Sequence, residues 1–133
     1  MKTDFRFGLL VFPMLMIFLF TGCSGTNSGT KYNADVRLVR EGYLHMNPNV
    51  PIGKAFDQFF INDSWKSFIS TENEKIVEFK GDCSFDNEPA TVKVQFEILG
   101  NEFIVHYVGL NNVPLNDLDG LSVLEKVLSE YRP

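Results

Sequence analysis

The sequence predicts an α+β domain: an antiparallel meander of about four to five strands, with a short N-terminal helix and a C-terminal helix packed on one face. Three observations lead to this class. Residues 91–98 alternate apolar and polar side chains, Gly100 and Asn101 form a two-residue hairpin signal, and helical apolar spacing flanks the strand patterns on both sides. We expect a single domain over residues 35–133.

The segment before the first helix reads as a strand. In residues 35–46, Val36 and Leu38 alternate with Arg37, and Gly42 interrupts the pattern, so we expect a strand with a bend there. A turn cluster follows, and Pro51 suits the first position of a helix. The helix is predicted from apolar residues at helical spacing, which are Ile52, Ala55, Phe56, Phe59 and Phe60.

Four further strand patterns follow this helix. Trp65 and Phe68 indicate the beginning of one strand, and residues 75–80 predict a second that ends or bulges at residues 81–83. Residues 91–98 and 102–109 form the hairpin that we expect at the centre of the sheet, with one solvated face.

The last element is predicted to be a helix capped by Asn116 or Asp117. Gly120 weakens its first turn. Its predicted buried face consists of Leu118, Leu121, Leu124, Leu128 and Tyr131, with Val127 beside it.

The N-terminus has the features of an export signal. Lys2 and Arg6 precede an uncharged run in which residues 7–20 are mostly apolar, and Pro13 interrupts it. Such a run is shorter than the ~20 residues that a membrane-spanning helix needs, whereas it fits a secretory signal peptide over residues 1–22. An uncleaved signal anchor is the alternative.

Leu19, Thr21, Gly22 and Cys23 resemble the lipobox of bacterial lipoproteins, with Phe20 where that family usually has leucine. The resemblance implies diacylglycerol on the Cys23 thiol, cleavage after Gly22 and acylation of the new amino group, so that acyl chains anchor the protein in a membrane. Residues 23–34 would then be the lipidated cysteine and a flexible tether. Serine at position 24 implies the outer membrane if the cell is Gram-negative.

A second resemblance covers residues 42 to about 113. The pattern of Ile52-Gly53-Lys54-Ala55-Phe56 with Phe59-Phe60, then Trp65 and Phe68, then Val77-Glu78-Phe79 with Gly81 and Cys83, then Gln95-Phe96, looks like a small uncharacterised domain of bacterial envelope lipoproteins and of some zinc-ribbon membrane proteins. The layout is also loosely similar to β-lactamase-inhibitor-like folds of envelope lipoproteins. Both resemblances imply architecture and location rather than an activity.

Charge and motifs exclude several function classes. Residues 23–133 carry 10 basic and 16 acidic side chains, and the basic ones are scattered, so nucleic acid is not an expected partner. No residue pattern frames a nucleophile, a cofactor or a metal, so we expect no enzyme activity and no cofactor.

The chemically versatile residues have structural interpretations. If Cys23 is lipidated, Cys83 has no second cysteine in the chain with which to form a disulfide. A buried inert thiol is then favoured over a reactive thiol or an intermolecular bridge. His45 and His106 are expected to be satisfied or surface histidines, although Cys83 and His106 could pair across neighbouring strands. An acidic loop is expected to be a solvated hairpin rather than a weak calcium site (Asp82, Asp86, Asn87 and Glu88). Asp117 and Asp119 suit a helix N-terminus, and eight aromatic residues suit the core (Phe56, Phe59, Phe60, Trp65, Phe68, Phe79, Phe96 and Phe103).

The sequence favours a membrane-anchored lipoprotein that presents a small, non-enzymatic interaction domain to another envelope protein. One alternative is a periplasmic inhibitor or exclusion-type factor, which predicts an exposed aromatic patch with an acidic rim. Another is a small-ligand-binding domain, which would need a concave polar pocket near Cys83 or His106.

Overall fold

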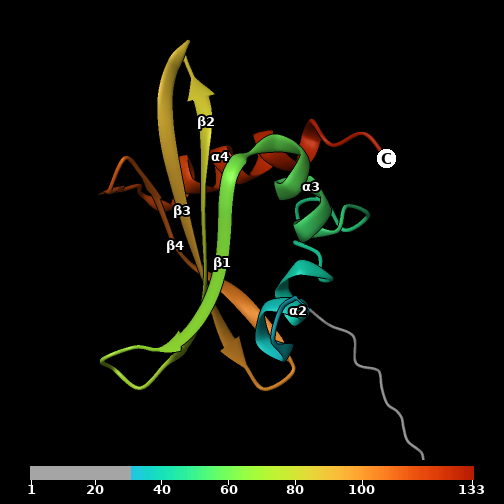
Figure 1. The fold of residues 1–133 in the computed structure, drawn as a ribbon, viewed down its shortest axis with the longest axis vertical. Coiled ribbons are helices and arrows are strands. Elements are labelled where there is room, and N and C mark those ends of the chain that lie inside the picture. The colour runs from blue at the N-terminus through green and yellow to red at the C-terminus, as the bar shows by residue number, and fades with distance from the viewer. Residues whose placement is uncertain (1–30) are drawn as a thin grey trace, which may run out of the picture. The chain divides into compact units, whose positions relative to one another are not determined.

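The computed structural model describes residues 31–133, and Tyr32–Pro133 form one compact unit. The elements follow in the order α2 (Ala34–Arg40), α3 (Ile52–Phe59), β1 (Ile61–Ile69), β2 (Lys75–Phe85), β3 (Glu88–Leu99), β4 (Glu102–Leu110), β5 (Val113–Pro114) and α4 (Asp117–Ser129). The strands form one antiparallel sheet in sequence order, as Figure 1 shows. The α+β meander predicted from the sequence is confirmed.

Tight turns connect the later strands. Asp86 and Asn87 join β2 to β3 at φ 52° and 64°, and Asn111 and Asn112 join β4 to β5 at φ 52° and 68°. Gly100, at φ 69°, begins the two-residue turn between β3 and β4, which confirms the predicted hairpin. Asparagine, aspartate and glycine accept this left-handed backbone more readily than other residues, so local sequence sets the register of each hairpin.

The core lies between the helices and one face of the sheet. Phe79 of β2 and Phe96 of β3 are fully buried, and Phe56 of α3 packs on Phe79 with ring centroids 4.7 Å apart. Trp65 of β1 lies 4.9 Å from Phe79 by the same measure. Because successive strand residues point to opposite faces, the residues between these aromatic positions form the second face of the sheet.

The prediction of a strand over residues 35–46 is wrong, because α2 occupies Ala34–Arg40. The buried residues are Val36 and Val39, which are three positions apart and therefore share a helix face. Asn33 caps the helix by accepting a hydrogen bond from the backbone N–H of Val36 at 2.9 Å. Asp35 in the first turn and Arg40 in the last turn complement the helix dipole. The Val36–Leu38 alternation was therefore incidental.

The prediction that the second strand ends or bulges at residues 81–83 is also wrong. β2 continues in regular register, with Gly81 opposite Val92 and Cys83 opposite Ala90. A Cβ atom at position 81 would lie 2.6 Å from Cζ of Phe79 and 2.8 Å from Cβ of Phe60. Gly81 is thus explained by the close approach of aromatic side chains rather than by a break in the strand.

The predicted face of the C-terminal helix is partly wrong. Leu124 and Leu128 are buried as expected, but Leu118 is 74% exposed and Leu121 is 47% exposed. The buried face also contains Val123, Val127 and Gly120. A Cβ atom on Gly120 would lie 3.2 Å from Val108 of β4, so the helix lies closest to the sheet where it has no side chain. This contact fixes the rotation of α4 about its axis.

We expected the hairpin of residues 91–98 and 102–109 at the centre of the sheet, but only its first strand, β3, is central. β3 lies in the middle of the sheet between β2 and β4. On the side of β4 that faces away from β3, only Gly109 and Leu110 are paired, and their partners are the two residues of β5. Within the described residues, the first part of β4 is therefore an edge of the sheet.

Candidate functional site

A groove lies along the outer edge of β4, and we call it the β4-edge groove. It has a volume of about 790 Å³ and is bounded by the loop after α2, residues 101–105 and one residue of α4. Phe103 and Val105 point to the helix side of the sheet, whereas Ile104 points to the opposite face. A groove lined by all three must follow the strand edge itself.

Among residues 31–133, no strand pairs with the backbone along the first part of this edge. The pair Leu99 and Glu102 flanks the two-residue turn, so its members exchange both ladder hydrogen bonds. By alternation, Phe103 and Val105 direct their N–H and C=O groups outward, into the groove. The outward carbonyl of Val108 accepts a hydrogen bond from the N–H of Leu115 at 2.9 Å, and pairing with β5 begins beyond it.

The groove exposes apolar side chains and has an acidic rim. Tyr43 is 51% exposed, Ile104 49% and Leu121 47%. Glu41 and Glu102 are among the lining residues, which include neither lysine nor arginine. Leucine, tyrosine and isoleucine surfaces gathered on one rimmed groove are typical of docking surfaces.

Close packing fixes the loop that forms one wall of the groove. Gly42 lies against the ring of Phe103, since a Cβ atom there would come within 2.6 Å of Cε1. The N–H of Ile52 also donates to the carbonyl of Gly42 at 3.0 Å, which ties the loop to the beginning of α3. His45 lies in this loop and lines the groove. The wall is therefore preformed.

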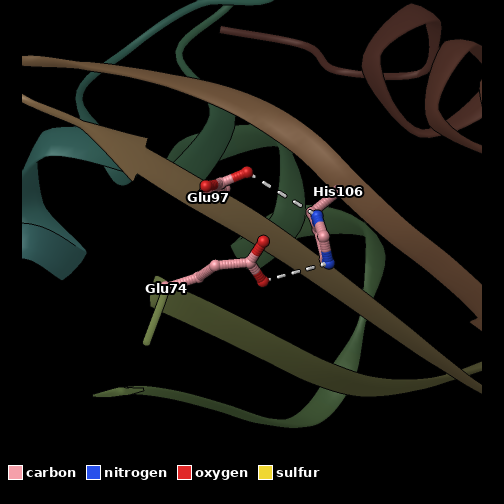
Figure 2. Close-up of side chains that lie close together, drawn as sticks. All are labelled: Glu74, Glu97 and His106. Atoms are coloured by element: carbon pink, nitrogen blue, oxygen red, sulfur yellow. Dashed lines mark ion pairs between the residues drawn. The ribbon is translucent and has the colours of Figure 1, made fainter. Parts of the chain in front are cut away.

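The second cluster of interest surrounds His106, on the sheet face opposite the core. His106 is the extra residue of a β-bulge, because Gln95 pairs with Tyr107 while the next β3 residue, Phe96, pairs with Val105. Its Nε2 lies 3.8 Å from Oε1 of Glu74 and its Nδ1 lies 3.8 Å from Oε1 of Glu97. Figure 2 shows the imidazole beside the two carboxylates, with one ring nitrogen directed toward each. His106 is thus a surface histidine with charged neighbours.

Sequence reasoning missed this cluster, although one signal was present. The two-residue turn after Leu99 places Glu97 of β3 opposite Ile104 of β4. His106 follows Ile104 by two positions along β4, so the turn by itself indicated that His106 lies near Glu97. Glu74 precedes β2 and is brought to the cluster by the register between β2 and β3, which no local turn signal predicts.

Cys83 lies on the helix side of β2 and is partly buried. Burial, and to a smaller extent the negative charge of Asp82, raise the pKa of its thiol above the ordinary value. The thiol is therefore protonated at neutral pH, in line with the expected inert character. It lines a cavity of about 270 Å³ together with Gln58, Glu130 and Tyr131, which is slightly below the size of common ligand sites at ~300–1,000 Å³.

The alternative in which Cys83 pairs with His106 is excluded by the strand register. Cys83 opposes Ala90, whereas His106 lies beside Gln95 and Phe96, five to six residues further along β3. At ~3.3 Å per strand residue this separation is roughly 17–20 Å along the sheet. β3 also lies between the two strands that carry them.

The predicted acidic loop is shorter than the sequence suggested, because Asp82 lies within β2 and Glu88 begins β3. Asp86 and Asn87 form the β2–β3 hairpin turn. Asp82 accepts a hydrogen bond from the hydroxyl of Thr91 at 2.8 Å. Asn116 caps α4 by accepting from the N–H of Asp119 at 2.8 Å, and both predicted aspartates lie in the first turn.

The expected aromatic core is confirmed with one exception. Seven of the eight rings belong to the core or pack against it, namely Phe56, Phe59, Phe60, Trp65, Phe79, Phe96 and Phe103. Phe68 instead lies on β1 opposite Ile76, is 36% exposed, and belongs to the other face of the sheet.

The described residues thus form a small α+β domain with one helix-covered sheet face, in which the outer edge of β1 and the outer edge of the first part of β4 have no strand beside them. Comparison with models of known protein families, with characterised proteins and with solved structures gave no match. The predicted signal peptide, Cys23 and most of the tether lie outside the described residues. None of the described helices is both long and apolar enough to cross a membrane.

Proposed function

We propose that this protein is a lipid-anchored envelope lipoprotein whose domain binds an extended segment of another envelope protein along the β4-edge groove. The observation that carries the proposal is the open edge of β4, whose outward backbone groups lie in a groove with exposed apolar side chains. An extended segment that adds a strand there would satisfy these groups and bury the apolar side chains in one step.

Charge complementarity narrows the expected partner. Glu41 and Glu102 line the groove, and no lysine or arginine among its lining residues offsets them. Residues 23–133 as a whole carry a net charge of −6. We therefore infer that the bound segment alternates apolar residues with lysine or arginine, so that one side packs into the groove and the other meets the carboxylates.

The anchor gives this binding its location. A diacylated or triacylated Cys23 would hold the protein firmly, since each buried CH₂ contributes about 0.8 kcal/mol. A tether before Tyr32 would let the domain reach a partner in the same membrane or in the space beside it. A Cys23→Ser variant is expected to leave the membrane fraction, and a variant that stayed there would contradict the anchor.

The second candidate function is inhibition of an envelope enzyme or of an incoming agent. This candidate predicts an exposed aromatic patch with an acidic rim, and in its favour the groove carries one exposed aromatic ring, Tyr43, near the carboxylate of Glu41. The two candidates share the same surface, so they differ in the partner. An enzyme that loses activity on binding would favour inhibition.

Site-specific photo-crosslinking in cells tests the proposed surface. A photoreactive amino acid at Ile104, in the groove, is compared with one at Lys80, an exposed residue of β2 on the open face of the sheet. We expect a specific envelope protein to be captured from position 104 and not from position 80. Capture should be lost with Tyr43→Ala and retained with Lys80→Ala.

The captured peptide is then identified by mass spectrometry. A segment with alternating apolar and basic residues would support strand addition at the β4 edge. Equal capture from both positions, or a captured segment that is helical or acidic, would refute the proposed binding mode.

A further inference from the structure

We propose that Glu74, Glu97 and His106 form a binding site for a transition-metal dication, with Zn²⁺ as the preferred ion among those that cells hold in quantity. The three residues come from the turn before β2, from β3 and from the bulge of β4. This site is separate from the groove-binding function and does not depend on it.

The donor atoms are close to a coordinating arrangement. One ligand atom from each residue can be chosen so that all three lie within 4.8 Å of one another. Zinc bonds of about 2.0–2.2 Å in tetrahedral geometry place neighbouring ligand atoms roughly 3.3–3.6 Å apart. Glu74 lies 3.8 Å from Nε2 of His106 and Glu97 lies 3.8 Å from Nδ1, so an ion bound through either nitrogen already has one carboxylate near that range. The other carboxylate must approach the ion by rotation of its side chain, and the side chains of Glu74 and Glu97 are partly exposed.

The local charge balance favours a cation. Glu74 and Glu97 bring two carboxylates together, and among the described residues their only ion pairs are with His106. The nearby lysines have other partners, since Lys75 pairs with Asp35 and Lys66 with Glu78. A neutral imidazole leaves the two negative charges uncompensated, whereas a dication between the three groups neutralises both.

The backbone holds the ligands in place before an ion arrives. Glu97 lies on the central strand, and the bulge sets the position of His106 beside it. Glu74 is fixed by the β1–β2 turn, because its N–H donates to Oγ of Ser70 at 3.1 Å and its carbonyl accepts from the N–H of Ser70 at 2.8 Å. Sites supported by strands and tight turns lose less conformational entropy when they bind.

The donor set indicates the class of metal. Ca²⁺ and Mg²⁺ prefer six or more oxygen ligands, whereas one imidazole nitrogen with two carboxylates suits Zn²⁺ and similar ions. Three protein ligands leave a coordination position for water or for a donor atom from another molecule. His106 is 39% exposed at its side chain, so solvent reaches that position.

Calorimetry with ZnCl₂ on the full-length protein, purified in detergent and stripped of metal with a chelator, tests the site. His106→Gln and Glu97→Gln should each weaken Zn²⁺ binding about tenfold or more, as loss of a ligand contact requires. His45→Gln is the matched control, because it removes the only other histidine from a different part of the surface, and it should leave the affinity unchanged. Cys83→Ser controls for binding by the thiol in the same way.

Imidazole NMR signals provide an independent readout. Zn²⁺ should shift the ring signals of His106 and leave those of His45 in place, while Ca²⁺ at the same concentration should shift neither. Equal Zn²⁺ affinity in the wild type and in His106→Gln would overturn the proposal. So would ring signals of His106 that respond to pH but not to Zn²⁺, because the cluster would then bind a proton rather than a metal. Circular dichroism of each variant separates lost binding from lost folding.

Discussion

Gly81→Ala is the substitution whose effect follows most directly from the packing of the core. The new Cβ atom would lie 2.6 Å from Cζ of Phe79 and 2.8 Å from Cβ of Phe60, where ordinary carbon contacts are about 3.5–4.0 Å. Phe79 is fully buried and Phe60 nearly so, and the contact at Phe60 is next to the backbone, so neither residue moves freely.

The expected cost combines two opposing effects. Overpacking a buried site costs about 1–3 kcal/mol. Replacing glycine in a strand regains about 0.5–1 kcal/mol of backbone entropy. We therefore expect Gly81→Ala to lower the free energy of unfolding by about 1–2 kcal/mol, which corresponds to a Tm lower by roughly 4–15 °C for a domain of this size.

Urea unfolding followed by tryptophan fluorescence measures this effect. Trp65 is the single tryptophan and lies in the same aromatic cluster, 4.9 Å from the Phe79 ring, so its emission reports on the core. The matched test is Gly81→Ala in a Phe79→Leu background, where the nearest ring atom is gone and the cost of the alanine should be smaller. Stability equal to or above the wild type, or the same cost in both backgrounds, would refute the packing explanation and revive the interpretation of Gly81 as a strand break.

Three further outcomes follow from individual contacts. Gln95→Leu should destabilise the domain by about 1–3 kcal/mol in urea unfolding, because the buried carboxylate of Glu78 loses a hydrogen bond of 2.7 Å; an unchanged midpoint would mean that water replaces the amide. Native Cys83 should react with a thiol reagent at least tenfold more slowly than in urea, and the rate should rise only at alkaline pH, because burial raises its pKa. Since the neutral thiol is favoured in the folded state, its contribution to stability should be complete at neutral pH and decline as pH rises through the raised pKa; a fast reaction at pH 7 would contradict this. Arg40→Lys should cost about 1 kcal/mol of unfolding free energy, because lysine cannot reproduce the two hydrogen bonds of 2.9 and 2.6 Å to Asp57, whereas equal stability would show that charge alone suffices.

Local patterns correctly predicted the elements in which the spacing of apolar residues along the segment is enough to define the buried face. Residues 91–98 alternate strictly and form the core of β3, and the turn at Gly100 set the register of the next strand. The helical spacing around Phe56 likewise predicted α3. In these segments the apolar face is continuous and unique, so only one secondary structure buries it.

Where two patterns competed, the sequence was not sufficient. Val36 fits both an alternation with Leu38 and a helical pair with Val39, and the cap from Asn33 favours the helix. The leucines of α4 offer more than one apolar face, and contact between Gly120 and Val108 selects the face that excludes Leu118. The cap at Asn33 is a local signal that the strand prediction overlooked, whereas the face of α4 depends on a partner distant in the chain, which a local window does not contain.

By itself, the sequence determined the fold class, the meander of the strands that follow α3 and the hairpin turn at Gly100, and it carries the predictions of an inert thiol at Cys83 and of a lipid anchor at Cys23. Only the tertiary structure decided which strand edge stays open and which polar side chains meet. The β4-edge groove exists because β5 pairs with only two residues of β4. Glu74, Glu97 and His106 meet because the register between strands brings together residues that lie more than twenty positions apart or across a bulge. Backbone pairing across a sheet is a long-range property, whereas propensity, capping and turn chemistry act over a few neighbouring residues.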